Sequence, residues 1–347
     1  MDASALIPPD QSPPPPPPTG SLSQTQLDSA RRLLEQAKYE LKQVIVGQDA
    51  LLDGLLLAVM CKSHVLIEGA PGLAKTLALR SLAAVMRVSF KRIQFTPDLL
   101  PSDLIGTRIY NSHDGSFSVE KGPLFGHFIL ADEINRAPAK VQSALLEAMQ
   151  ERQVTIGKDT FELPSPFMVM ATQNPIEQEG TYPLPEAQMD RFLFKLLVGY
   201  PTEAEELAIL DRYTNRTGVT AQPVLGAEQI ELLATMAEQV YLDPAHAQHV
   251  VQLVQATRNN HPHIAFGASP RATLSIARAS KARALMHGRH YVLPEDLMAV
   301  AKDCLRHRIL LTYEAMAKGV TPDQLLDEAL GPLALHKAEP PHEASMS

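Results

Sequence analysis

The alternation of apolar and polar residues divides the chain into an α/β part and a later, helical part. Short apolar runs predict buried β-strands at 65–67, 127–131 and 167–171, and the residue pattern predicts further strands at 90–95, which is rich in β-forming residues, and at 192–198. Apolar residues at helical spacing predict helices around these strands, at 22–42, 49–62, 77–86 and 138–149. From Pro201 onward the strand-like runs end, and helical patterns follow at 203–214, 226–240, 244–259, 270–287 and 295–311.

We therefore expect an α/β domain over 21–200 and a separate all-helical domain over 201–335. Within the first domain, two alternating pairs predict inserted β-hairpins, at 108–110 with 116–120 and at 153–156 with 161–163. The first hairpin is a candidate for contact with a substrate or partner. Residues 1–20 include a run of prolines and predict a disordered tail, and residues 336–347 predict a loose one. The proline-rich tail is either a solvated appendage or a docking peptide for an aromatic groove.

The stretch between the first strand and its following helix has the residue types of a phosphate-binding loop. Gly69 and Gly72 let backbone N–H groups turn toward phosphate oxygens, and the helix N-terminus adds a positive dipole end. Lys75 can reach the β- and γ-phosphates, and Thr76 can offer its hydroxyl to Mg²⁺. Ala74 stands where the full pattern has glycine, and we expect a negative φ there, which alanine accommodates. The alternative interpretation is an ordinary glycine turn before a helix.

Two adjacent carboxylates follow the strand predicted at 127–131. Asp132 can hold Mg²⁺ through water, and Glu133 can orient and deprotonate the attacking water. A helix cap is the alternative, but a cap needs only one short polar residue beside the helix. After the next strand, Asn174 can hydrogen-bond the attacking water or the γ-phosphate, although an Asn before proline is also ordinary turn chemistry.

Two arginines are candidates for contact with the terminal phosphate. Arg191 adjoins the last predicted strand, where it is a surface residue, half of an ion pair with Asp190, or a cation presented to the nucleotide of a neighbouring subunit. Ser269 is a good N-cap, and it places Arg271 in the first turn of a helix, where the macrodipole disfavours a cation. This placement suggests an anion near Arg271, and a γ-phosphate would serve. The alternative is that the arginine has no functional meaning there and costs the helix only about a few tenths of a kcal/mol.

A tight turn between the first two helices contains Val46 and Gly47. Its apolar side chains and backbone groups could wrap an adenine ring, or the turn could simply join two helices. Spacing alone leaves the two interpretations equal.

Composition limits the choice of partners and compartment. The formal net charge is −8 and the pI is about 5.8, which argues against nucleic acid as a partner because phosphate backbones need a basic face. Two cysteines in apolar helical contexts suggest buried free thiols in a reducing compartment. No run of eighteen apolar residues and no signal pattern stands in the chain, so we expect a cytoplasmic protein without a membrane span.

Together these motifs resemble the MoxR family of AAA+ ATPases. The resemblance covers roughly residues 40–312 and rests on stretches at 46–48, 68–76, 94–103, 131–138, 171–177, 180–192 and 267–271. It implies a P-loop core with a parallel five-stranded sheet in the order 5-1-4-3-2, two inserted hairpins and an all-α lid. Alanine at position 74 is itself like this family's usual form.

The resemblance also implies roles for individual residues. Lys75 and Thr76 resemble the Walker A pair, and Asp132 and Glu133 the Walker B pair. Asn174 is similar to sensor one, Arg191 to the arginine finger and Arg271 to sensor two, while Arg136 is a further candidate at the subunit interface. The expected contacts to ATP or ADP are Val46, Gly47, Gly69, Ala70, Pro71, Gly72, Leu73, Ala74, Lys75, Thr76, Leu77 and Asp132. Thr76 and Asp132 are the expected Mg²⁺ ligands, partly through water.

The leading hypothesis is a Mg²⁺-dependent ATPase whose subunits share each active site in a homo-oligomeric, hexameric ring. Family members are frequently linked to von Willebrand factor A domain proteins and to maturation or metallocofactor insertion, so a partner or client protein is expected. One alternative is a nucleotide-gated assembly module with little hydrolysis. Others are phosphoryl transfer to a small molecule and a motor subunit of the magnesium-chelatase type.

Overall fold

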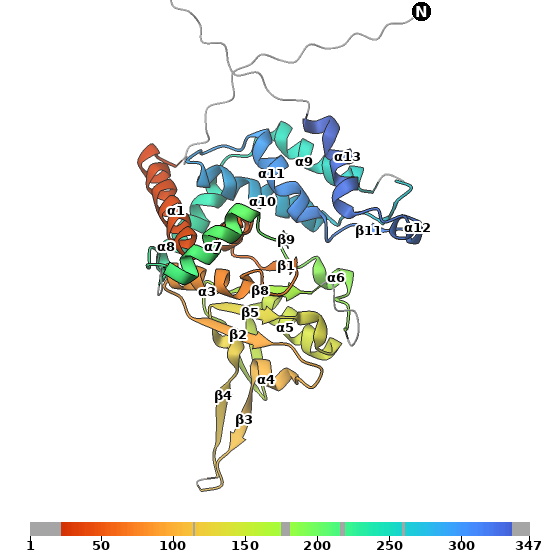
Figure 1. The fold of residues 1–347 in the computed structure, drawn as a ribbon. Helices are drawn as coiled ribbons and strands as arrows, with labels where there is room; N and C mark the ends of the chain where they lie inside the picture. The colour runs from red at the N-terminus through yellow and green to blue at the C-terminus, as the bar shows by residue number, and fades with distance from the viewer. Residues whose placement is uncertain (1–21, 114, 175–180, 216–218, 259–260, 335–347) are drawn as a thin grey trace, which may run out of the picture.

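A parallel sheet of five strands forms the centre of the molecule, in the order β2-β5-β8-β1-β9 (Figure 1). This order confirms the 5-1-4-3-2 arrangement implied by the resemblance. The computed structural model describes residues 22–113, 115–174, 181–215, 219–258 and 261–334, so the predicted tails at 1–20 and 336–347 lie outside the described residues. The strands are β1 (Val65–Gly69), β2 (Phe90–Gln94), β5 (Phe128–Asp132), β8 (Met168–Gln173) and β9 (Phe194–Val198).

Successive strand residues pack on opposite faces of the sheet, and both faces are covered by helices. Val65 and Leu130 share an apolar cluster with α1 (Gln24–Val44), α2 (Asp49–Met60) and α3 (Lys75–Val85). Leu66 and Ile129 share another with α4 (Pro101–Ile105) and α5 (Ala139–Glu151). Because both faces of the inner strands β1, β5 and β8 are buried, these three strands are apolar runs rather than alternating ones, which explains why the sequence located them. Strand β2, at the edge of the sheet, is mostly exposed and contains Lys91 and Arg92.

Two antiparallel hairpins extend from this core, at the positions where the sequence pattern predicts them. One pairs β3 (Gly106–Tyr110) with β4 (Phe117–Lys121), and the other pairs β6 (Gln153–Ile156) with β7 (Asp159–Glu162). The β3–β4 hairpin projects away from the body of the molecule (Figure 1). It carries two exposed aromatic side chains, Tyr110 and Phe117, whose ring centroids are 5.1 Å apart.

A mainly helical region follows the sheet and packs against α1 and α2. Its helices are α7 (Glu203–Asn215), α8 (Ala227–Gln239), α9 (Pro244–Ala256), α10 (Pro270–Met286), α11 (Pro294–Leu305), α12 (Tyr313–Ala317) and α13 (Pro322–Ala334), and the C-terminal part of this region is a helical lid. Helix α10 contacts α1 and α2, and α11 contacts β9. Buried residues of α10 such as Ile276 therefore belong to the same apolar cluster as Leu34 of α1.

The sequence prediction is wrong at the end of α11. The predicted helix 295–311 stops at Leu305, and Leu310–Leu311 forms β11, which pairs antiparallel with β10 (Ile264–Phe266). The lid therefore contains a short two-stranded sheet where helices alone were expected. Between α11 and β11, Arg306, His307 and Arg308 all hydrogen-bond to backbone carbonyls of residues 190–195. A continued helix would turn these consecutive side chains toward different sides of its axis.

His64, just before β1, helps to fix the central strands. It is 4% exposed, and its Nδ1 accepts a hydrogen bond from the Val169 N–H (3.0 Å), so Nε2 donates to the carbonyl of Met149 (3.1 Å). Burial, and to a lesser degree the positive charge of the nearby Arg152, lowers the pKa of His64 from 6.5 to about 3. The folded protein therefore holds the neutral ring.

We predict that His64 makes the protein less stable in mild acid. Below pH 6.5 the unfolded chain protonates His64, whereas the folded protein does so only near pH 3. Stability therefore falls as the pH falls through this window, by about 1.4 kcal/mol per pH unit for this group. Urea unfolding of the wild type and of His64→Gln, at about pH 7.5 and about pH 5.5, measures this pH dependence of the free energy of unfolding. The variant should lose about 1 kcal/mol less over this range, and an unchanged pH dependence would contradict the assignment.

Candidate nucleotide-binding site

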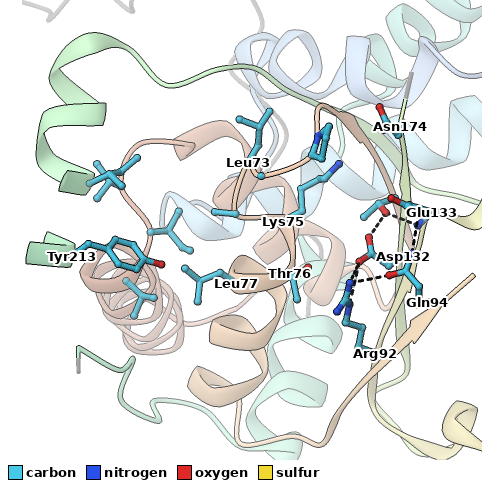
Figure 2. A pocket seen from close by; sticks show the side chains of 18 of the residues that line it. Leu73, Lys75, Thr76, Leu77, Arg92, Gln94, Asp132, Glu133, Asn174 and Tyr213 are labelled. Carbon is cyan, nitrogen blue, oxygen red and sulfur yellow. Dashed lines mark hydrogen bonds and ion pairs between the residues drawn. The ribbon is translucent and has the colours of Figure 1, made fainter. Parts of the chain in front are cut away.

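A cavity of about 510 Å³ opens where β1, β5 and β8 end (Figure 2). In parallel α/β sheets, ligands bind at this edge because the loops that follow the strands meet there. The lining residues come from four places: the segment after α1, the loop after β1, the ends of β2, β5 and β8, and α7. They are Val44, Ile45, Val46, Pro71, Gly72, Leu73, Ala74, Lys75, Thr76, Leu77, Arg92, Gln94, Asp132, Glu133, Thr172, Asn174, Ile209, Arg212 and Tyr213.

The loop after β1 has the backbone of a tight turn into α3. Gly69 lies so close to β9 that a Cβ atom there would be 2.6 Å from the carbonyl oxygen of Val198. Gly72 has a φ of +84°. Ala74 also has a positive φ, +55°, so the expectation of a negative φ at this position is wrong. The turn sets this angle, and alanine accepts a left-handed conformation at a cost of about 1–2 kcal/mol.

Lys75 bends back over this loop. Its Nζ donates a hydrogen bond to the carbonyl of Gly69 at 2.7 Å. Partial burial lowers the pKa of Lys75 below its ordinary value, while the negative charges of Asp132 and Glu133 act in the opposite direction. The ammonium group is therefore electrostatically coupled to the carboxylate pair across the cavity (Figure 2).

The buried hydroxyl of Thr172 orders the two carboxylates. Thr172 is 1% exposed, and its Oγ1 donates to Oδ1 of Asp132 (2.7 Å) and accepts the N–H of Glu133 (2.9 Å). Glu133 itself has a φ of +57°, a left-handed conformation at the end of β5. One side chain from the neighbouring strand therefore fixes both the Asp132 carboxylate and the backbone that carries Glu133.

The other carboxylate oxygens are held from β2. Arg92 donates to Oδ2 of Asp132 (2.7 Å from Nη2) and to Oε1 of Gln94 (2.9 Å). Nε2 of Gln94 in turn donates to Oε2 of Glu133 at 2.9 Å (Figure 2). Nε of Arg136 lies 3.0 Å from the same Glu133 oxygen. The pair thus has a donor on each side, and Glu133 is restrained before any substrate is present.

The opposite wall of the cavity is more apolar. Val46 lines it, together with Ile209 and Tyr213 of α7. Gly47, expected as a nucleotide contact, does not line the cavity, because the Glu205 carboxylate of α7 lies against it. Apolar side chains with one aromatic ring are typical of a surface that receives a base.

The structure brings most of the predicted site residues together, and it separates the two arginines from them. Gly69 and Ala70 belong to the loop but do not line the cavity, whereas Asn174, 8% exposed, does. Arg191 and Arg271 line a different depression, of about 240 Å³. There, Nη1 of Arg271 lies 3.6 Å from Oδ2 of Asp190, so the anion beside Arg271 within the chain is a carboxylate.

Sequence reasoning missed several lining residues. Arg92 and Gln94 lie in β2, beside other polar residues, and Thr172 lies near the end of β8, where a polar residue directly after an apolar run is a signal that could have marked it. Ile209, Arg212 and Tyr213 lie more than one hundred positions after the loop, in a helix whose pattern gave no sign of a ligand.

Comparison with known proteins agrees with this P-loop arrangement. The model of the ATPase family associated with various cellular activities (AAA) matches residues 64–194, and the AAA lid domain model matches residues 255–329. The chain is 51% identical to chaperone MoxR1 of Mycobacterium tuberculosis, over 87% of this chain and 82% of that protein. It is 45% identical to YeaC of Bacillus subtilis, over 86% of this chain and 93% of that protein.

A crystal structure of a protein from Cytophaga hutchinsonii has the same fold. It superposes with a TM-score of 0.83 at 46% identity and covers 88% of this chain and 95% of its own. The fold and the cavity define a AAA ATPase, an enzyme class that binds and hydrolyses ATP. Within that class, the chain belongs to the MoxR family. Among the described residues, none of the helices combines the length and the apolar character needed to cross a membrane.

We predict that Thr172→Val slows ATP hydrolysis without unfolding the protein. The substitution keeps the shape but removes the hydroxyl that joins Asp132 to the Glu133 backbone. Losing these hydrogen bonds should lower kcat by about 10- to 100-fold. Steady-state phosphate release measures this. The matched control is Thr155→Val in the β6–β7 hairpin, whose hydroxyl only meets that of Thr160. Equal effects of the two changes would contradict the role of Thr172.

Proposed function

We propose that this protein is a Mg²⁺-dependent, chaperone-like ATPase that assembles into a ring and uses hydrolysis to remodel or mature partner proteins. The supporting observation is that the polar and charged groups expected at the site lie in two separate places. Lys75, the two carboxylates and Asn174 line one cavity, whereas Arg191 and Arg271 line another depression. A complete site would then need the arginines of a second subunit.

In this proposal, water attacks the γ-phosphate in line with the leaving ADP oxygen. Glu133 accepts the proton of the attacking water, and Asn174 orients that water or the γ-phosphate. Lys75 contacts the β- and γ-phosphates, exchanging its bond to the Gly69 carbonyl for phosphate oxygens. Val46, Ile209 and Tyr213 receive the adenine. ADP and phosphate are the products.

The side chains of the cavity fit a magnesium ion. Thr76 and Asp132 both line the cavity and offer only oxygen donors, which Mg²⁺ prefers. The described residues hold no cluster of three or more His, Cys, Asp or Glu side chains suited to a metal, which suits a cation held mainly by phosphates and water. Bound there, Mg²⁺ would neutralise charge on the phosphates. Arg92 now occupies Oδ2 of Asp132 and would have to yield or to bind alongside.

Two observations favour a shared site. Nε of Arg191 is buried without a hydrogen-bond partner among the described residues, which leaves its guanidinium available for an external anion. In addition, α7 forms a wall of the cavity yet has no buried residue, and Leu207, Leu210 and Tyr213 are at least 60% exposed. An uncovered apolar helix face of this kind is typical of a subunit interface. A ring, hexameric as the family resemblance implies, would cover it.

The restraint on Glu133 favours a second candidate function. Gln94 and Arg136 both engage its Oε2, so an isolated subunit would activate water poorly. A nucleotide-gated assembly module with little turnover would keep this arrangement permanently. In the leading proposal, assembly or a partner releases Glu133.

The cellular role is proposed from the relatives. MoxR1 of Mycobacterium tuberculosis is named a chaperone, and we infer a similar role here, with a client or von Willebrand factor A domain protein as partner. Both cysteines are buried and free, which suits the reducing cytoplasm. Nucleic acid is not proposed, because the chain is acidic overall.

We predict that Glu133→Gln binds ATP but hydrolyses it about 10²–10⁴-fold more slowly, because the amide cannot accept the proton. Calorimetry with ATP and Mg²⁺ measures binding, and phosphate release measures turnover. Wild-type turnover by the variant would contradict the assignment of the base. A wild type that assembles with ATP without releasing phosphate would support the assembly module instead.

We predict that mixing two inactive variants restores activity. Arg191→Ala subunits keep a complete loop and carboxylate pair, whereas Lys75→Ala subunits keep Arg191. In a mixed assembly, an Arg191→Ala cavity receives the guanidinium of a Lys75→Ala neighbour. Removing such an arginine costs on the order of 10³–10⁵ in rate, so partial recovery is easy to detect. No recovery at any ratio, in assemblies shown to be mixed by native mass spectrometry, would argue for sites contained in one chain.

A further inference from the structure

The residue that precedes Arg191 is held by the lid. Asp190 follows the short helix α6 (Glu186–Met189) as its C-cap. Oδ2 of Asp190 accepts a hydrogen bond from Ser269 Oγ at 2.9 Å, and Oδ1 accepts one from Arg308 Nε at 2.7 Å. Arg271 lies 3.6 Å from Oδ2. Ser269 and Arg271 begin α10, and Arg308 lies between α11 and β11, so two separate parts of the lid converge on one carboxylate.

Arg308 also binds the backbone on both sides of Arg191. Its guanidinium donates to the carbonyls of Asp190 (3.1 Å), Phe192 (2.7 Å) and Leu193 (3.2 Å). The Arg308 side chain is only 2% exposed, and an arginine buried to this degree requires acceptors for its donors. The segment around Arg191 supplies most of them. The main chain that carries Arg191 is thereby fixed to the lid.

The Arg191 side chain itself is not held in this way. Its Nε has no hydrogen-bond partner among the described residues, and the side chain lines the depression that also contains Arg271 and Arg308. The lid thus fixes where the Arg191 side chain starts and leaves its guanidinium for another partner.

We propose that Arg308 and Ser269 are positioning residues for Arg191: through Asp190 and the adjacent carbonyls, the lid sets where Arg191 meets the terminal phosphate in a neighbouring subunit. This inference rests on the proposed role of Arg191 in a shared site. Displacing a reacting or stabilising group by about 1 Å can cost about a hundredfold in rate. A lid movement that shifts these hydrogen bonds therefore changes turnover in the neighbour's site.

Arg306 provides a matched control for a purely structural contact between the lid and the sheet. Arg306 lies two residues away with a side chain 9% exposed, and it also joins the lid to the sheet, through the carbonyl of Lys195. Its other partners are Asp303 and Asp323, both in the lid. Arg306 shares the burial of Arg308, yet among the described residues it makes no hydrogen bond to residues 190–193.

The test is a double-mutant cycle with full-length protein. Arg308→Lys keeps the positive charge but cannot bind the carboxylate and the carbonyls together. We expect kcat to fall about 10- to 100-fold with an unchanged KM for ATP, because Arg308 does not line the ATP cavity. In the Arg191→Ala background, Arg308→Lys should cause no further loss. Arg306→Lys, with a similar loss in melting temperature, should leave kcat within about twofold.

The outcomes separate the two proposals. If Arg191→Ala hydrolyses ATP at the wild-type rate, the shared-site function fails. If Arg191→Ala is impaired but Arg308→Lys lowers kcat by the same factor in both backgrounds, the positioning role is overturned. Should Arg308→Lys not fold, Ser269→Ala tests the same carboxylate. Its control is Asp243→Ala, which removes the N-cap of α9 and does not contact Asp190.

Discussion

The parallel pairing of β1 with β8 on one side and β9 on the other is the constraint on which the site depends. It places Ile67 beside Thr172 and Gly69 beside Val198, so the phosphate loop leaves the sheet next to the end of β8. The close approach of Gly69 to β9 leaves no room for a side chain there. Because the five strands run in one direction, the polar residues that follow β1, β5 and β8 meet at a single edge.

At that edge, hydrogen bonds between strands hold the two carboxylates in different ways. Thr172 and Arg92 hold the two oxygens of Asp132, so this carboxylate keeps one orientation, as its proposed role toward Mg²⁺ would require. Glu133 is restrained at a single oxygen by Gln94 and Arg136, and in the proposed function assembly or a partner releases this restraint. A side chain held as firmly as that of Asp132 loses little freedom when substrate arrives.

The arrangement of the lid is compatible with the proposed site shared between subunits. Helices α10 and α11 pack on α1, α2 and β9, and Arg308 extends from them to the segment around Arg191. Helix α7 instead lies over the cavity with its apolar side chains exposed. The nucleotide cavity and the arginine-lined depression are therefore separate surfaces of one chain, as the proposed repeating contact between identical subunits would require.

By itself, the sequence determined the parts that depend on neighbours in the chain. The loop at 69–76 and the pair Asp132–Glu133 are each a continuous stretch of sequence, and the buried strands are short apolar runs. Local patterns and the family resemblance therefore located the loop, the pair and the strands. Tertiary structure decided the positive φ of Ala74, the end of α11 at Leu305, and the hydrogen bonds from β2 and β8 to the carboxylates. It also decided the distance of Arg191 from its own cavity and the place of α7. These features depend on partners tens to hundreds of residues away, and packing, rather than any local preference, brings those partners together.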